Sequence, residues 1–115
     1  MKIYFTFRYL VLGQYIYNPQ YVFDNNFTGL PFVYKYICGD INKDGRHLGM
    51  VEYNGDISEE EIRNLLREAL ASFAYHEKTP EKALEFARYI TNLPEDKVYL
   101  DENGYIVIEG DQNEL

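Results

Sequence analysis

An alternation of apolar and polar side chains at the start of the chain constrains its fold more than any other feature. Large apolar side chains occupy the odd positions from Ile3 to Val11, and polar side chains such as Thr6 and Arg8 lie between them. A repeat of two residues is the pattern of a β-strand with one buried face. An amphipathic helix would instead repeat every 3.6 residues. We therefore expect a strand over residues 2–12, with its odd-numbered side chains facing the core.

Three further segments of the first half are also rich in β-forming residues. Residues 14–23 fit a strand, but Pro19 cannot donate a hydrogen bond to a neighbouring strand, so we place this segment at a sheet edge or a bulge. Residues 32–38 and 48–53 fit two more strands. The polar loop between them contains Gly, Asp and Asn, which is typical of a hairpin turn.

The second half begins with two helices. Ser58 and Glu61 form a capping box, and an apolar stripe at helical spacing runs from there to Phe73. A second helix begins at Thr79, where an N-cap residue is followed by proline, and it ends before Pro94.

The last segment, residues 97–109, contains an Asn-Gly step between two short apolar runs and predicts a hairpin. The expected fold is therefore α+β: an antiparallel sheet in the order ββββ-αα-ββ, with two helices packed on one face. We expect one domain over residues 1–110 and a frayed C-terminal tail over residues 111–115.

Composition excludes several classes of protein. The chain has 115 residues, a net charge of −8 and a hydrophobic fraction of 46%. These values fit one globular domain, and they exclude a disordered chain, a repeat array and a basic nucleic-acid module. Cys38 is the only cysteine, so a disulfide scaffold is excluded and a reducing compartment is expected. The N-terminus lacks the unbroken apolar run of a signal peptide, and we predict a cytoplasmic protein, of a cell or an infected host cell, without a membrane span.

The sharpest local motif is the loop that follows Cys38. Asp40, Asn42 and Asp44 occupy positions 1, 3 and 5 of a calcium loop, and a glycine follows at position 6. This half of the loop resembles an EF-hand or dockerin-type loop, which implies calcium binding. Position 12, where a bidentate Glu would complete the coordination, is Val51. The same residues also suit a plain hairpin turn, which is the interpretation we favour, so we expect no metal and no other cofactor.

A second candidate site surrounds the same loop. Cys38 and His47 flank it, so a hairpin could bring a thiol beside a base, with Asp40 or Asp44 to orient the imidazole. Such a nucleophile would need a lowered thiol pKa. A lone cysteine at the end of a strand is more often a small buried apolar residue. We therefore assign no catalytic residue and favour a protein that is not an enzyme.

The tyrosines indicate a binding surface. The chain contains 12 Tyr and 7 Phe, and a sheet covered by helices on one face leaves some of these rings on the other. Tyrosine is enriched at protein interfaces because it combines a large apolar area with a hydrogen-bonding hydroxyl. The alternative is that the rings only stabilise cross-strand pairs. The predicted aromatic face consists of Tyr4, Arg8, Tyr15, Tyr17, Tyr34 and Tyr36.

The acidic residues concentrate in the second half, because the first 39 residues contain Asp24 as their only acid. A surface of that sign attracts basic patches on other proteins. The predicted acidic face consists of Glu59, Glu60, Glu81 and Glu85. In size and charge the chain is similar to small acidic phage and archaeal-virus proteins that inhibit host nucleases, which implies an inhibitor of a defence enzyme that handles nucleic acid.

We therefore predict a protein that acts by binding a macromolecule, in the first place another protein, as an inhibitor or adaptor of viral or mobile-element type. A symmetric homodimer through the aromatic sheet is a further expectation. The alternatives are calcium binding at residues 40–45 and single-stranded nucleic-acid binding, in which bases would stack on the aromatic sheet face. The net charge of −8 opposes the approach of phosphate groups.

Overall fold

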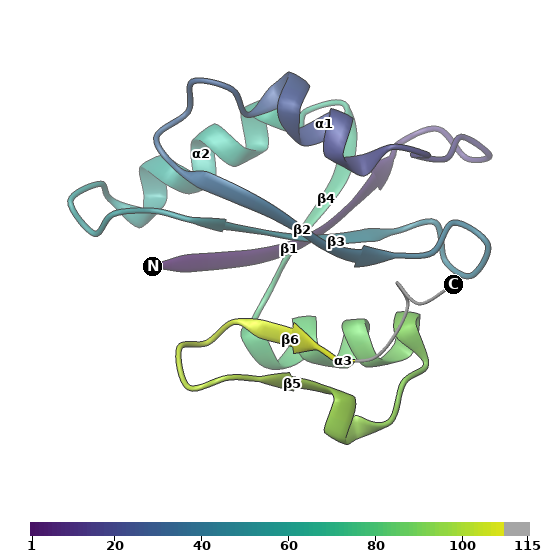
Figure 1. Ribbon diagram of the computed structural model, residues 1–115. Helices are drawn as coiled ribbons and strands as arrows, with labels where there is room; N and C mark the ends of the chain where they lie inside the picture. The colour runs from purple at the N-terminus through teal and green to yellow at the C-terminus, as the bar shows by residue number, and fades with distance from the viewer. Residues whose placement is uncertain (110–115) are drawn as a thin grey trace.

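A four-stranded antiparallel sheet forms the middle layer of the computed structural model, which describes residues 1–109 (Figure 1). Its strands are β1 (Lys2–Tyr9), β2 (Val33–Gly39), β3 (His47–Glu52) and β4 (Phe73–Lys78). They lie in the order β2-β3-β1-β4. The sheet is therefore built around the alternating first segment, with β2 and β4 at its edges.

Two helices cover one face of the sheet. Helix α1 (Pro19–Asn26) and helix α2 (Glu59–Ala69) lie above it in Figure 1. The odd-numbered side chains of β1 pack against them, as the alternation predicts. Phe5 and Phe7 are fully buried with Phe23 of α1 and Leu66 of α2, in a core that we call the upper core. The layer formed by α1 and α2 is the upper layer. The aromatic rings of this core meet at tilted or edge-on angles, which is the preferred geometry for such pairs.

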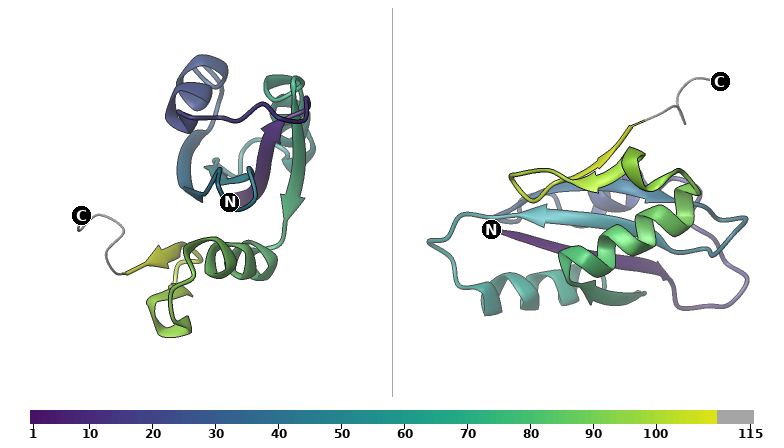
Figure 2. Two further views of the ribbon diagram at one scale, coloured as in Figure 1. Left: turned by 90° about the vertical axis from the view of Figure 1, so that its right-hand side faces the viewer. Right: turned by 90° about the horizontal axis from the view of Figure 1, so that it is seen from below.

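A third helix and a hairpin cover the opposite face (Figures 1 and 2). Helix α3 (Pro80–Thr91) is followed by a short 3-10 turn, η1 (Glu95–Lys97), and by the paired strands β5 (Val98–Leu100) and β6 (Ile106–Ile108). We call α3 and this hairpin the lower layer. The core between this layer and the sheet is the lower core, and its buried members are Tyr4, Cys38, Leu48, Met50, Ala83, Phe86, Ala87, Ile90, Val98 and Ile106.

The α+β class and the antiparallel sheet agree with the sequence-based prediction, but the order of elements does not. Residues 14–23 do not form a strand; residues 10–18 form a loop, and α1 begins at Pro19. The cause is local, because the side chain of Asn18 accepts a hydrogen bond from the Tyr21 backbone N–H and proline fits the first helical position. Pro19, which suggested an edge strand in the sequence, in fact marks the start of a helix.

The helix that begins after Ser58 is also shorter than predicted. It ends at Ala69, and Phe73 opens the strand β4, which pairs with β1. Residues 73–78 mix aromatic and charged side chains. Phe73 and Tyr75 pack against the same core as the odd-numbered side chains of β1, and β4 lies at the edge of the sheet. The prediction that both helices pack on one face is wrong as well, since α2 and α3 lie on opposite faces (Figure 2).

The predicted frayed tail, residues 111–115, lies outside the described residues. Within residues 1–109, no helix has the length and apolar character needed to cross a membrane.

Candidate docking surface at the loop end of the sheet

The two ends of the sheet differ in character. At one end, which we call the loop end, β1 runs into residues 10–18 and the turn 40–46 connects β2 to β3. At the other end, which we call the acidic end, α2 begins after a short loop that follows β3, and α3 begins directly after β4. The turn of the β5–β6 hairpin joins the acidic end, because the Tyr4 hydroxyl donates to the Gly104 carbonyl (2.5 Å).

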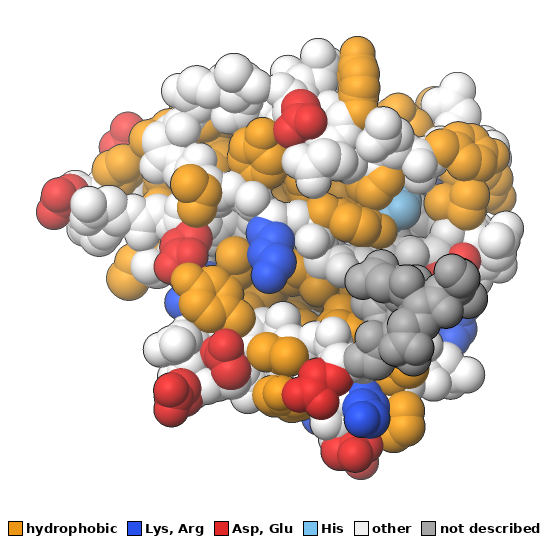
Figure 3. Space-filling model, viewed as in Figure 1, with side chains coloured by type: hydrophobic (Ala, Val, Ile, Leu, Met, Phe, Trp, Pro, Cys, Tyr) orange, Lys and Arg blue, Asp and Glu red, His pale blue; other side chains and the backbone are white. Residues whose placement is uncertain are grey.

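The loop end exposes a run of large apolar side chains on residues 10–18, which we call the apolar loop. Leu12 is 82% exposed and Tyr17 is 77% exposed. Figure 3 shows hydrophobic side chains clustered at the right edge, over this loop. Single exposed apolar residues are ordinary, but a contiguous group marks an interaction site. The exposed group consists of Leu10, Val11, Leu12, Tyr15 and Tyr17, with Tyr21 of α1 beside it.

The apolar loop is fastened to the sheet at Ile16. This side chain is 2% exposed and belongs to the upper core, whereas its neighbours on either side point to solvent. The Ile16 carbonyl accepts a hydrogen bond from Nε2 of His47 on β3 (3.1 Å). The Tyr15 ring lies against Gly45 in the turn between β2 and β3. One buried residue therefore sets the position of a loop that is otherwise solvated.

A cavity of about 310 Å³ lies between the apolar loop and the turn 40–46. Its lining includes Leu12 and Tyr15 of the loop together with Arg8 and Arg46. Arg46 is bound to Asp44 through two hydrogen bonds, and its guanidinium lies 4.9 Å from the centre of the Phe86 ring. This ion pair lowers the pKa of the Asp44 carboxyl. The cavity thus combines tyrosine, leucine and arginine, and tyrosine and arginine are enriched where partners bind tightly.

The structure brings together only part of the predicted aromatic face. Tyr15, Tyr17 and Arg8 lie at the loop end, as the preceding observations show. Tyr4 is 1% exposed beneath α3 and the hairpin, so the expectation that it lies on an open sheet face is wrong. Tyr34 and Tyr36 are half-buried against the upper core, where their hydroxyls bond to Asp24 and His47.

Tyr4 is buried because the fold has a third layer. A single helix layer would leave one sheet face open, but α3 and the β5–β6 hairpin cover that face. Burial raises the pKa of the Tyr4 hydroxyl, and a backbone hydrogen bond opposes this shift. No broad aromatic platform remains on the sheet within residues 1–109.

The predicted acidic residues are all exposed, but they lie on two layers. Glu59 and Glu60 begin α2 on the upper layer, and Glu81 and Glu85 lie on α3 on the lower layer. The starts of both helices meet at the acidic end, where Glu59 and Pro80 line a common cavity of about 370 Å³.

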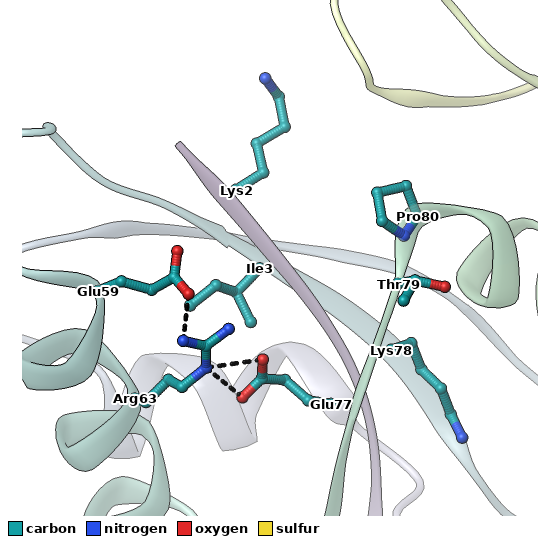
Figure 4. A pocket seen from close by; sticks show the side chains of 8 residues that line it. All are labelled: Lys2, Ile3, Glu59, Arg63, Glu77, Lys78, Thr79 and Pro80. Atoms are coloured by element: carbon teal, nitrogen blue, oxygen red, sulfur yellow. Dashed lines mark hydrogen bonds and ion pairs between the residues drawn. The ribbon is translucent and has the colours of Figure 1, made fainter.

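Figure 4 shows how this second cavity is organised. The Arg63 guanidinium bonds to Glu77 through Nε (2.8 and 2.9 Å) and to Glu59 through Nη1. These contacts hold the Arg63 pKa above its usual range. Both carboxylates that bind Arg63 belong to this same cavity, while Lys2 and Lys78 point away from the arginine. This cavity is a structural ion-pair cluster in the middle of an acidic surface.

The candidate calcium residues form a hairpin turn. Asp40 accepts a hydrogen bond from the Asn42 backbone N–H (2.9 Å), and its carbonyl accepts three more from residues 43–45. Asp44 is paired with Arg46 rather than turned toward Asp40. No cluster of three or more metal-ligating side chains occurs within the described part of the chain.

Cys38 and His47 do not form a catalytic pair. Cys38 lies in the lower core with Leu48, whereas His47 packs on Phe7 and Tyr36 in the upper layer. Burial raises the pKa of the Cys38 thiol to about 12, the opposite of what a nucleophile requires. Both ring nitrogens of His47 are engaged by other partners.

The sequence-based prediction missed Leu10, Val11 and Leu12, which it placed within the first strand. A signal for them exists: the alternation breaks at Leu10, where an even position becomes apolar, and Gly13 follows. Gly13 has φ +86° and lies in the turn of the loop, where the Gln14 N–H donates to the Val11 carbonyl. The apolar residues between the end of β1 and Gly13 therefore form an exposed loop and do not extend the strand.

The fold and its surfaces define the class of the protein as a small three-layer α+β domain with an exposed apolar loop and an acidic opposite end. Comparison with protein-family models, curated proteins and solved structures finds no match to the chain.

Proposed function

We propose that the protein acts by binding another protein, as an inhibitor or adaptor, with the apolar loop as its anchor. The observation that carries the proposal is the exposure of Leu12 and Tyr17 within a contiguous apolar group that the fold itself does not use. Small monomeric proteins seldom expose such a group unless a partner covers it. The partner we infer has an apolar recess that receives this loop.

The charge distribution supports a basic partner. Acidic side chains outnumber basic ones at the acidic end, where Asp56, Glu60 and Glu81 are exposed. A field of this sign speeds the encounter with a basic surface without direct contact. Enzymes that handle nucleic acid present such surfaces, since they bind phosphates. We therefore propose an enzyme of this kind as the partner class.

Nucleic acid is the weaker candidate for the ligand. Stacking of bases needs exposed rings beside a basic track. Tyr4, Tyr34 and Tyr36 are covered or half-covered. Tyr15 and Tyr17 are exposed, but Arg46 beside them is paired with Asp44, so the loop end offers no continuous basic track within residues 1–109. Leu10, Val11 and Leu12 have no face on which a base can stack, whereas they suit an apolar recess.

The test compares matched variants in capture from lysates of the cells in which the protein occurs. The double substitution Leu12→Ser and Tyr17→Ser removes the anchor. Val33→Ser is the control, because Val33 is 64% exposed on β2, outside the apolar loop. A protein retained by wild type and by V33S, but lost with the double variant, is then purified and its affinity measured.

We expect the double variant to bind on the order of 30-fold more weakly, the loss typical of an interface hot spot. The association rate should fall as salt rises, because the acidic end steers the encounter. Equal capture by all three proteins would overturn the proposal. Light scattering that shows a dimer for wild type and a monomer for the double variant would also overturn it, since the occupant would then be a second copy.

A further inference from the structure

The polar anchor of the apolar loop is a buried histidine that has no charged partner among residues 1–109. His47 is 3% exposed, and its imidazole bridges two elements. Nε2 faces the Ile16 carbonyl, which can only accept, so Nε2 carries a proton. Nδ1 lies 3.0 Å from the Tyr36 hydroxyl on β2. The neutral ring therefore donates to the loop and accepts from Tyr36, and both nitrogens are satisfied.

The backbone of β2 is shaped around this ring. A Cβ atom at Gly39 would overlap Nδ1 of His47 and would lie 2.9 Å from the Tyr36 hydroxyl. Gly39 pairs with His47 across the two strands. The absence of a side chain at this position is what allows the imidazole to reach both of its partners.

The surroundings of the ring favour its neutral form. Phe7 packs on it from β1, with the ring centres 5.7 Å apart. Tyr36 is the titratable group that faces it from β2, and burial holds the pKa of that hydroxyl above its usual range. Ile16 faces it from the apolar loop with a carbonyl. Among residues 1–109, no carboxylate is hydrogen-bonded or ion-paired to His47. Asp44 is paired with Arg46, and Asp40, whose charge contributes to the raised pKa of Tyr36, accepts a hydrogen bond from the Asn42 N–H.

We propose that His47 is a proton-sensitive anchor, which holds the apolar loop on the sheet when neutral and releases it when protonated. The consequence for binding rests on the proposed function; the release itself does not. A second proton would fall on Nδ1 and place a positive charge in an aromatic pocket without a counter-charge. Opening of the loop would return the ring to water, so protonation and opening are linked.

The sign of the effect follows from this linkage. Burial lowers the pKa of His47 in the closed state, against about 6.5 for a solvated histidine; the hydrogen bond to the Ile16 carbonyl opposes this shift but does not outweigh it. The open state therefore binds a proton more readily. The closed loop is fully favoured above about pH 6.5, and the opening equilibrium should rise by up to about tenfold for each pH unit below it.

The experiment measures the loop in the free protein, with no partner present. NMR follows amide hydrogen exchange, corrected for its intrinsic pH dependence, at Tyr15, Ile16 and Tyr17 from pH 8 to pH 5, together with the imidazole ¹⁵N shifts of both histidines. His47→Gln places an amide that does not titrate where the imidazole stands. His76→Gln is the matched control, because His76 is the other histidine and is exposed on β4.

We expect exchange in the loop to increase below pH 6.5 in wild type and in H76Q, and to lose this dependence in H47Q. A loop whose protection is independent of pH in wild type would overturn the anchor. So would an Nδ1-protonated neutral imidazole, because the bond to Ile16 would then be absent. These wild-type readings decide the matter even if H47Q does not fold. Failure here leaves loop-dependent partner capture intact, so the two proposals fail separately.

Discussion

Thr6 offers a direct test of the third layer of the fold. Its side chain is fully buried on the face of β1 that α3 covers, and its hydroxyl has no hydrogen-bond partner among the described residues. A buried hydroxyl without a partner costs about 1–3 kcal/mol, and replacement by an apolar group of the same shape removes that cost. Thr6→Val should therefore stabilise the protein by about 1–2 kcal/mol, or roughly 4 °C in Tm for each kcal/mol.

Urea unfolding followed by circular dichroism measures the effect, with Thr6→Ser as the matched variant. Serine keeps the hydroxyl and loses one buried methyl group, so T6S should be less stable by about 1 kcal/mol. The predicted order of stability is T6V, then wild type, then T6S. An order in which T6V is less stable than wild type, with T6S unchanged, would refute the reasoning. In that case Thr6 would face solvent or a polar partner, and α3 would not cover this face.

Three further predictions concern single sites. Gly39→Ala should destabilise the protein by about 3 kcal/mol in urea unfolding because the new methyl meets His47, whereas Gly55→Ala, with open space around it, should be neutral; equal effects would contradict the close packing. Cys38 should resist a thiol reagent at pH 8 until urea unfolds the protein, because burial raises its pKa to about 12; fast labelling of the native state would show an accessible thiolate. Ser58→Ala should cost about 1 kcal/mol of unfolding free energy, because the Glu61 N–H loses its acceptor; an unchanged midpoint would mean that water replaces the cap.

Local signals in the sequence predicted much of the fold. The alternation from Ile3 to Phe7 places a strand with one face in the upper core, and the caps Ser58 and Thr79 mark where two helices begin. The Asn-Gly step within residues 97–109 lies in the turn of a hairpin. These elements were predictable because each is specified by neighbouring residues.

The failures at residues 73–78 and at Tyr4 have a common cause, because both depend on contacts between distant segments. The failure at Pro19 has a local cause. Pro19 is compatible both with an edge strand and with a helix start, and the Asn18 side chain decides between them. Phe73 continues a helical stripe in sequence, yet its segment pairs with Tyr9 at the sheet edge. The burial of Tyr4 depends on α3, which lies some 80 residues further along the chain.

The same limit applies to the candidate site. Tyr15 and Tyr17 are predicted as binding residues because they flank Pro19 at an expected sheet edge, whereas the structure places them on a loop. The exposure of Leu12 follows only from the loop geometry. The polarity of the molecule was expected between an aromatic sheet and acidic helices. It runs instead along the strands, from an apolar loop at one end to acidic helix starts at the other.

The central claim, that a partner protein covers the apolar loop, is tested most directly by photo-crosslinking in the cells in which the protein occurs. A photoreactive phenylalanine replaces Leu12 in one protein and Val33 in a second. We predict a covalent adduct of a single other protein from position 12 and none from position 33. The absence of any adduct at position 12, or the same adducts from both positions, would contradict the claim.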